Sequence, residues 1–334
     1  TAFNDNLISP TTVVWDLPVR YTVAKVQTYI PANYDFKFHG PVTVRTAFAN
    51  SYNVPAIKVI DAVGPDRVAQ IGRAMGLTTL SDQPGTYNLP LTLGANEVTL
   101  LDLTNAFHTL DNGGIYAPYR FILGIQDSAG QDLNLYPEAP WWQAVSPQAA
   151  FLATSIMSDY KARQPPFGAN TPLNLAVYPA AAKTGTSSSF RDNWTIGFTR
   201  HLVVGVWAGN SSGRPMLGAS GVTGAAPIWN KFLTRVLTDT QLIEGTLGVS
   251  TDPAYWQFEP PPGIAEQELE CPKEVYCSRK TEYYTTDWLA KTGRNGPTGD
   301  GIAMRDRVAR VNVTNGSSSF FAGVCSTPRG TERT

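Results

Sequence analysis

The sequence predicts an α+β domain in which helices come first and an antiparallel sheet follows. Helix-like apolar spacing recurs between residues 42 and 157. Three strand-like runs come next, at Ala180–Ser188, Asn193–Thr199 and Leu202–Ala208. The links between them are only a few residues long, and links this short join antiparallel neighbours, because a parallel pair needs a long crossover.

Turn residues divide the helical half into short helices. Helix formers fill Val42–Asn50, and we expect a helix there that ends near Ser51-Tyr52-Asn53. Pro55 suits a first helical position and predicts the start of a second helix. A third helix is expected over Pro65–Met75, where a glycine follows.

Further along, Val98–Leu110 is the clearest helix candidate. Most of its apolar residues, starting with Leu100, lie on one face, and Asn112-Gly113-Gly114 ends it. Phe121–Ile125 is predicted to form a short strand. Ser146-Pro147 caps a further helix that runs to about Met157.

The last third of the chain changes in character. Ala226–Leu237 predicts a helix after the sheet. Its apolar residues at helical spacing are Ile228, Phe232 and Val236. Residues 246–263 contain Glu259-Pro260-Pro261-Pro262-Gly263 and are expected to form a stiff, proline-rich linker. Residues 264–334 are polar with scattered aromatics, and we expect a small C-terminal extension of unknown role.

Composition excludes several classes of protein. Among 334 residues, 42% are hydrophobic and 16% charged, which allows a sizeable core. The net charge of −1 provides no basic field for a phosphate backbone, so nucleic acid is not an expected partner. No run of 18 apolar residues occurs, so this chain is not expected to span a membrane.

The cysteines and histidines give no metal-site pattern. Cys271, Cys277 and Cys325 all lie in the last quarter, and the three histidines are scattered without a Cys-x-x-Cys pair. We therefore expect no metal. A local Cys271–Cys277 bridge in an oxidising compartment and unpaired thiols both remain open.

Two short motifs carry the chemistry. Ser51-Tyr52-Asn53 is a Ser-x-Asn triplet at a predicted helix–helix junction, and Lys183-Thr184-Gly185-Thr186 lies on a predicted strand. Ser-x-x-Lys, Ser-x-Asn and Lys-Thr-Gly together are the signature of serine β-lactamases and penicillin-binding proteins. Ser-x-Asn alone is a weak signal. Its order before Lys-Thr-Gly, and the strand hairpin that follows, make the pair more specific.

The match extends beyond these triplets. Thr43–Asn53 resembles the alanine-containing helix that precedes Ser-x-Asn, and Glu97–Gly114 resembles the helix that ends in a Gly-Gly turn. Lys183–Gly209 resembles the hairpin after Lys-Thr-Gly. Residues 1–245 therefore resemble the transpeptidase domain of class A-type, bifunctional penicillin-binding proteins. The resemblance implies the penicillin-binding/serine β-lactamase-like α+β fold: an antiparallel sheet flanked by helices, with a helical subdomain.

One departure concerns the nucleophile. In this family it lies in Ser-x-x-Lys before Ser-x-Asn, and no such motif precedes Ser51. The only match, Ser158-Asp159-Tyr160-Lys161, falls between the other two motifs, which is the wrong order. Thr1-Ala2-Phe3 resembles the tail of the helix that bears the motif, so we expect a chain truncated after its nucleophile segment.

The resemblance implies a role for each motif residue. Ser51 would relay a proton to the leaving amine, Asn53 would hold the substrate backbone, and Lys183 would supply positive charge. Thr184 and Thr186 would bind the terminal carboxylate. Gly185 would let the substrate lie against the strand edge, and the Thr186 backbone N–H would form half of the oxyanion hole. No cofactor is implied.

Ordinary structural roles compete with these. Ser51 also suits a helix cap, Asn53 a turn and Lys183 an exposed surface. Tyr52 suits either the site or the core. Trp194 and Trp207 are expected to be core residues of the hairpin, and His108 is expected to be structural.

The function implied is D,D-transpeptidation of peptidoglycan stem peptides by serine acyl transfer at D-Ala-D-Ala, with β-lactam antibiotics as inhibitors. It would act at the extracytoplasmic face of the cell membrane, held by an upstream anchor, with cell-wall synthesis proteins as partners. The chain alone would be inactive. The alternatives are a D,D-carboxypeptidase or serine β-lactamase on the same fold, and a non-catalytic peptide-binding relative.

Overall fold

The computed structural model describes residues 1–23, 27–133, 140–269, 271 and 275–292. A three-stranded antiparallel sheet lies at its centre, in the order β7 (Ala181–Thr186), β8 (Asp192–Phe198), β9 (Val203–Gly209). These are the three predicted strands. The register places Lys183 opposite Ile196, and β7 is an edge strand of the sheet.

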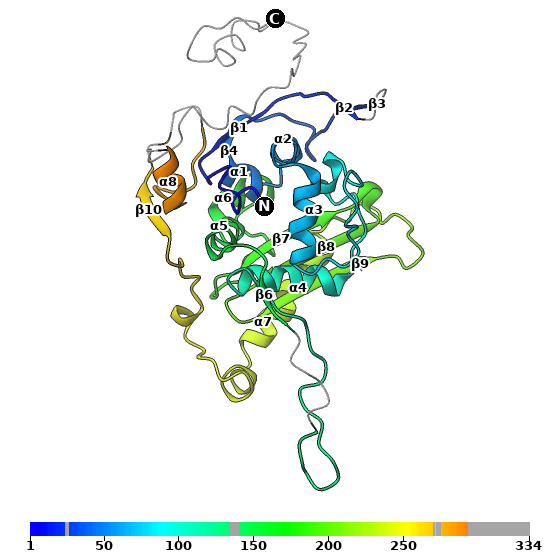
Figure 1. The fold of residues 1–334 in the computed structure, drawn as a ribbon, viewed down its shortest axis with the longest axis vertical. Helices are drawn as coiled ribbons and strands as arrows, with labels where there is room; N and C mark the ends of the chain where they lie inside the picture. Colours follow the sequence, from blue (N-terminus) through cyan, green and yellow to red (C-terminus); the bar gives the residue numbers. More distant parts are fainter. Residues whose placement is uncertain (24–26, 134–139, 270, 272–274, 293–334) are drawn as a thin grey trace, which may run out of the picture.

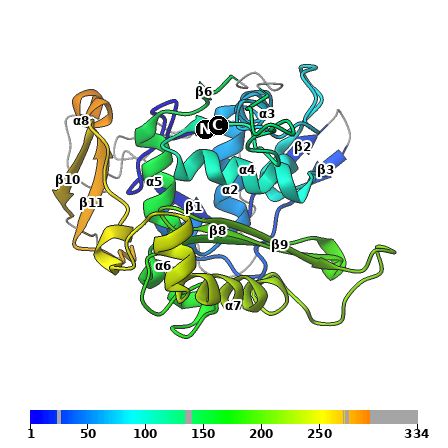
Figure 2. The same ribbon diagram turned by 90° about the horizontal axis from the view of Figure 1, so that it is seen from below.

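Helices cover both faces of this sheet (Figure 2). α4 (Leu100–Asp111) packs on one face and α7 (Ala225–Leu237) on the other. On the α4 side, Phe107 contacts Phe198 edge to face, with ring centroids 6.4 Å apart. The antiparallel sheet flanked by helices confirms the predicted α+β class.

The buried stripe of α7 differs from the predicted one by a single position. Ile228 and Phe232 are 53% and 54% exposed, whereas Trp229 and Leu233 are fully buried. Trp229 decides the orientation, because its ring fills the space left by Gly197, where a Cβ would lie 2.7 Å from it. Burying the larger indole removes more apolar surface from water.

The helical half surrounds the start of the chain, as Figure 1 shows. Its helices are α1 (Val44–Ala49), α2 (Asn53–Val63), α3 (Pro65–Ala74), α5 (Pro147–Met157) and α6 (Tyr160–Phe167). Two-stranded ladders are formed by β1 (Val13–Asp16) with β4 (Gly40–Thr43), β2 (Tyr21–Val23) with β3 (Gln27–Tyr29), and β5 (Ile115–Tyr116) with β6 (Trp142–Gln143). Short helical turns occur at Leu89–Leu93, Ser188–Phe190, Gln241–Thr246 and Pro253–Trp256.

The first two helices begin at other residues than predicted. Val42 pairs with Val14 in a strand, and α1 starts only after Thr43, whose side chain accepts the Thr46 N–H. α2 begins at Asn53, so that Pro55 lies inside its first turn, where its missing N–H costs no helical bond.

The buried face of α4 differs from the predicted apolar face. It includes the polar residue Asp102, while Leu100 stays 36% exposed.

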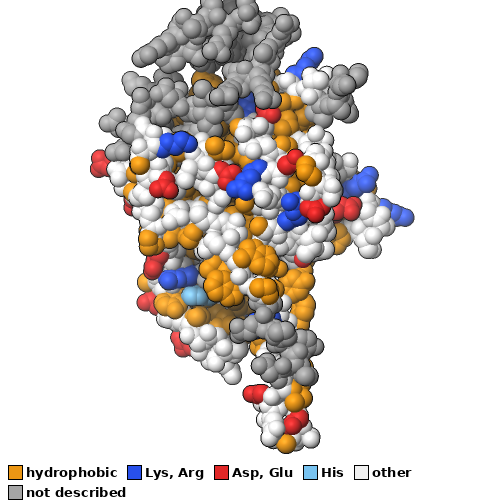
Figure 3. Space-filling view, viewed as in Figure 1, with side chains coloured by type: hydrophobic (Ala, Val, Ile, Leu, Met, Phe, Trp, Pro, Cys, Tyr) orange, Lys and Arg blue, Asp and Glu red, His pale blue; other side chains and the backbone are white. Residues whose placement is uncertain are grey.

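The strand predicted at Phe121–Ile125 is absent. This stretch forms part of a long arm that leaves the body between β5 and β6 (Figure 1), and the described residues of the arm form an isolated bridge between Gln126 and Asp132. Leu123 is 94% exposed, since residues 121–125 pair with no neighbouring strand in the described part of the chain. Figure 3 shows hydrophobic side chains gathered around β6, where Tyr116 stacks on Trp142.

The residues after the sheet pack back onto it. Trp256, within the expected linker, is fully buried with Trp229 in the α7 core. β10 (Ile264–Glu268) and β11 (Thr281–Thr285) form an antiparallel hairpin, followed by α8 (Thr286–Thr292). Cys271 and Cys277 form a disulfide, while Cys325 lies outside the described residues. The division at 245 and 263 stays a prediction.

None of the described helices combines the length and the apolar character needed to cross a bilayer.

Candidate active site

The two motifs meet at one hydrogen bond. The Lys183 ammonium donates to the Ser51 hydroxyl, with Nζ and Oγ 2.6 Å apart, and also to the Thr184 carbonyl at 3.1 Å. Ser51 follows α1 and Lys183 lies in the middle of β7. Folding therefore brings a helix terminus against the edge strand, as the motif roles require.

The turn after α1 holds Ser51 in place. The Ser51 N–H donates to Phe48 C=O at 3.1 Å and the Tyr52 N–H to Ala47 C=O at 3.0 Å. This pair of bonds is the Schellman helix end, in which the residue after the C-cap is left-handed and most often glycine. Ser51 takes that position with φ of +59°, a conformation that costs a side-chain-bearing residue about 1–2 kcal/mol. Glycine would be relaxed at this position, so the chain holds a hydroxyl here at a cost in conformational free energy.

Asn53 and Tyr52 contact the loop that precedes β4. The Asn53 amide donates to the Ala32 carbonyl at 2.8 Å, so this hydrogen bond goes to the loop and not to Lys183. The Tyr52 ring stacks on His39, with centroids 3.9 Å apart. Burial, with added repulsion from Asp35 and Asp16, raises the pKa of Tyr52 to about 12, so it stays a neutral phenol.

A buried carboxylate anchors this loop. Asp16 is fully buried and accepts hydrogen bonds from the Asn33 amide at 2.7 Å and the His39 backbone N–H at 3.0 Å. The Asn33 Oδ1 in turn accepts the Val54 N–H at the start of α2. These residues brace the Ser51-Tyr52-Asn53 turn. The sequence reasoning missed them because they belong to no motif and converge only in three dimensions.

A buried arginine lies behind β7. Arg163 donates to Ala182 C=O at 3.2 Å and to Met157 C=O at 2.7 Å, and only 2% of the residue is exposed. Burial, with added repulsion from the Arg163 charge, lowers the pKa of Lys183 from 10.5 to about 8. At neutral pH a measurable fraction of Lys183 is therefore uncharged and able to accept a proton.

The backbone of β7 presents polar groups at its open edge. The Ser187 N–H donates to Asp192 C=O at 3.0 Å, so the next pair, Thr186 and Asn193, falls in the outward-pointing phase of an antiparallel ladder. The carbonyls of Ala182 and Thr184 agree with this phase, since side-chain cations bind both. The Thr186 N–H thus points away from β8, as an oxyanion donor must.

The side chains of β7 are more engaged than the motif alone suggests. The Thr186 hydroxyl accepts the Gly221 N–H at 3.0 Å. Gly221 lies so close over the sheet that a Cβ would meet the Gly185 carbonyl oxygen at 2.6 Å. At Gly185 itself a Cβ would lie 3.4 Å from Trp194, an ordinary contact.

An aromatic contact joins the two sides beyond the motifs. Tyr34, in the loop before β4, meets Phe190, just after β7, with ring centroids 6.5 Å apart and nearly perpendicular. Ser189 and Phe190 both have positive φ, near +60°. The loop before β4 therefore reaches the end of the Lys-Thr-Gly strand, which periodicity could not reveal.

The out-of-order Ser-x-x-Lys lies elsewhere. Ser158 is the C-cap of α5, and its hydroxyl donates to the Ser155 carbonyl at 3.4 Å. Lys161 lies on α6 and is exposed. Neither contacts Ser51.

The sequence predicted core positions for Trp194 and Trp207 and a structural role for His108. Trp207 is 38% exposed and donates through its indole N–H to Asp192, so its assignment to the core is wrong. Trp194 is half-buried beside it. His108 is half-buried, and burial lowers its pKa.

In the described residues, neither a surface pocket nor a group of metal ligands involves the candidate site. A surface pocket of about 290 Å³ lies along α3, between Asp66 and Tyr87, and contains none of the candidate residues. Within the described part of the chain, no three His, Cys, Asp or Glu side chains are grouped to hold a metal ion.

The chain is similar to known proteins over most of its length. The family model described as "Penicillin binding protein transpeptidase domain" matches residues 1–231. Penicillin-binding protein 1C of Escherichia coli is 33% identical over 239 residues, 71% of this chain and 28% of that protein. Penicillin-binding protein 1A of Aquifex aeolicus is 34% identical over 65% of this chain and 28% of that protein. The chain thus spans little more than a quarter of these relatives.

Solved structures agree in fold. Penicillin-binding protein 1A of Haemophilus influenzae superposes with a TM-score of 0.67 at 22% identity, covering 85% of this chain and 46% of that one. The PonA1 protein of Mycobacterium tuberculosis, solved in complex with penicillin V, gives a TM-score of 0.60 at 23% identity, covering 71% and 66%. Family match, relatives and fold lead to one conclusion: the chain belongs to the penicillin-binding protein transpeptidase domain family.

Proposed function

We propose that these residues serve D,D-transpeptidation, the cross-linking of peptidoglycan stem peptides by serine acyl transfer. The observation that carries the proposal is the 2.6 Å hydrogen bond between Lys183 and Ser51 beside the open edge of β7. It joins an amine of lowered pKa to a hydroxyl, which is the arrangement a proton relay needs.

In the acylation step a serine oxygen attacks the carbonyl carbon of D-Ala-D-Ala. Its proton passes to the lysine one helical turn later in Ser-x-x-Lys, a motif with no correctly ordered match in this sequence. The C–N bond breaks as Ser51 gives its proton to the departing amine, and Lys183 restores the proton to Ser51. A free D-alanine and an ester remain. An amine from a second stem peptide then takes the acyl group by the reverse path.

The edge of β7 would bind the substrate. The Thr186 N–H would stabilise the developing oxyanion, a contact whose loss typically costs about 10²–10³ in rate. Thr184 and Thr186 would bind the terminal carboxylate beside the positive charge of Lys183, and the peptide would lie beside β7 as an added strand. β-Lactams would occupy the same position, in line with the penicillin V complex of PonA1.

The surroundings follow from the substrate. Stem peptides lie outside the cytoplasmic membrane, so we place the domain there, held by an anchor upstream in the protein and working with other cell-wall synthesis proteins. The Cys271–Cys277 disulfide supports an oxidising compartment.

Fluorescent penicillin labelling tests the function. The chain itself should not be labelled, because Ser158 is engaged at a helix end away from Lys183. In a longer protein that carries Ser-x-x-Lys, Lys183→Ala should abolish labelling, and Lys161→Ala, which removes an exposed lysine, should leave it intact. Rapid turnover of the acyl-enzyme would indicate a hydrolase, and absence of any labelling a non-catalytic relative.

A further inference from the structure

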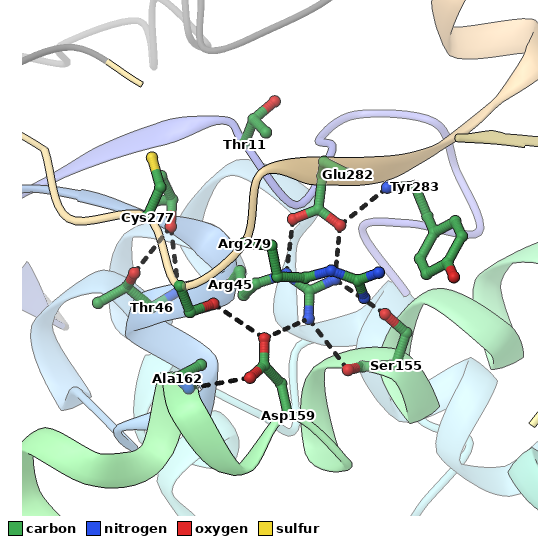
Figure 4. A network of polar contacts seen from close by, with 12 residues as sticks. Thr11, Arg45, Thr46, Ser155, Asp159, Ala162, Cys277, Arg279, Glu282 and Tyr283 are labelled. Atoms are coloured by element: carbon green, nitrogen blue, oxygen red, sulfur yellow. Dashed lines mark hydrogen bonds and ion pairs between the residues drawn. The ribbon is translucent and has the colours of Figure 1, made fainter. Parts of the chain in front are cut away.

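A buried ion pair ties the C-terminal hairpin to α1. The Arg45 guanidinium binds the Glu282 carboxylate through two hydrogen bonds of 2.6 Å, although 237 residues separate them (Figure 4). Only 3% of Arg45 and 1% of Glu282 are exposed. Arg45 also donates to Ser155 and Asp159 at the α5–α6 junction, as Figure 4 shows.

One branch of this network leads to Ser51. Arg45 lies in the first turn of α1, whose last turn forms the Schellman end that holds Ser51. The neighbouring Thr46 donates to the Tyr276 carbonyl of the same C-terminal segment. A helix of only six residues has little stability of its own, so its position depends on such tertiary contacts.

The other branch leads to Lys183. Asp159 receives hydrogen bonds from Arg45 at 3.3 Å and from Ser278 at 2.8 Å, and its other oxygen caps α6 by accepting the Ala162 N–H. The next residue of α6 is Arg163, which holds the carbonyl of Ala182 directly before Lys183. The same network therefore fixes both partners of the Ser51–Lys183 hydrogen bond.

The carboxylate at the centre lies outside the family match, which ends at residue 231. We propose that Glu282 is a positioning residue: through Arg45 and Asp159, the hairpin segment 276–285 sets the geometry of the Ser51–Lys183 pair. A buried ion pair is a poor device for stability alone, because desolvating both charges offsets most of their attraction. Its fixed bidentate geometry, by contrast, is well suited to holding one helix in one place.

The test measures how the reactivity of the Lys183 amine in this chain depends on pH. Acetic anhydride modification, followed by mass spectrometry, reports the pH at which the Lys183 amine becomes reactive, near pH 8 in the native chain. In Glu282→Gln the pair should loosen and water should reach Lys183. The midpoint pH of Lys183 reactivity should then rise by about one pH unit, and modification at pH 8 should slow roughly fivefold.

Glu266→Gln is the matched control. It makes the same chemical change in the same hairpin, at a carboxylate that is 45% exposed and binds Arg279 rather than Arg45. Its Lys183 profile should equal that of the native chain. A general loss of hairpin stability would move both variants, whereas positioning by Glu282 moves only one.

A second variant guards against misfolding of the first. Arg45→Met with Glu282→Met removes both charges and keeps the volume, an exchange that proteins often tolerate without loss of stability. Its near-UV circular dichroism should stay native while the Lys183 profile shifts as in Glu282→Gln. A native profile in either folded variant overturns the proposal.

The catalytic importance of positioning by Glu282 rests on the proposed function, but the measurement of Lys183 reactivity does not. If the Lys183 profile shifts as expected and Lys183→Ala in the longer protein is still labelled by penicillin, positioning by Glu282 is confirmed and the transpeptidase mechanism is wrong. If labelling requires Lys183 and the profile does not shift, the opposite holds.

Discussion

The Nζ atom of Lys183 lies 2.6 Å from the Oγ atom of Ser51, across 132 residues of sequence. One partner lies at a strained helix end and the other on a partly buried edge strand. Each of these circumstances carries a free-energy cost that substitution of the residue should reveal.

Lys183→Met should stabilise the fold at neutral pH. The pKa of Lys183 is lowered from 10.5 to about 8, so the folded chain binds this proton less tightly than the unfolded chain. The penalty is complete below pH 8 and disappears as pH rises to 10.5. Urea unfolding should show a gain on the order of 1–3 kcal/mol at pH 7 that shrinks toward pH 10.5. A gain that is constant with pH would contradict the burial of a charged Lys183.

Ser51→Gly should be more stable than Ser51→Ala. Both variants lose the hydroxyl, but only alanine retains a side chain in the left-handed conformation at φ of +59°. Thermal unfolding should separate the two by about 1 kcal/mol. Equal stability would mean that the turn relaxes, and that Ser51 is not strained.

Asp111→Asn should stabilise the fold in mildly alkaline solution. Burial raises the pKa of Asp111 from 3.8 to about 7, against an opposing effect of Arg200. The folded chain therefore holds this proton more tightly, and stability is lost as pH rises from about 4 through 7. The asparagine variant should gain on the order of 1–3 kcal/mol at pH 8 and little at pH 4, as measured by urea unfolding. An equal gain at both values would rule out titration of Asp111.

Gly221→Ala should disturb β7. The added Cβ would meet the carbonyl oxygens of Gly185 and Trp194 at 2.6 and 2.7 Å, and backbone atoms cannot easily move aside. A loss of about 1–3 kcal/mol and faster amide exchange in β7 are expected. Gly124→Ala is the control, because nothing lies within 4 Å of its Cβ position. Equal effects of the two changes would argue against close packing over β7.

The sequence predicted the elements whose signals are local. The three strands, the Ser146 cap of α5 and the extent of α3 and α7 all follow from periodicity and capping residues. The motif pair also met as expected, because Ser-x-Asn and Lys-Thr-Gly together specify one arrangement in space.

What the sequence could not predict depends on distant partners. The buried face of α7 differs by one residue from the predicted face, which places Trp229 over Gly197. Residues Phe121–Ile125 form no strand, because no partner strand lies beside them in the described part of the chain. Glu282 belongs to no motif, and its importance arises only when Arg45 is beside it. Such tertiary contacts override local propensity without leaving a periodic signal.

The Arg45–Glu282 pair also imposes an order in time. Arg45 emerges from the ribosome 237 residues before its carboxylate, which at about 5–20 residues per second is a delay on the order of ten to fifty seconds. Until then the guanidinium has no salt-bridge partner from the hairpin, and α1 must remain hydrated or loosely docked. Maturation of the Ser51–Lys183 pair is thereby deferred until the C-terminal hairpin has been made.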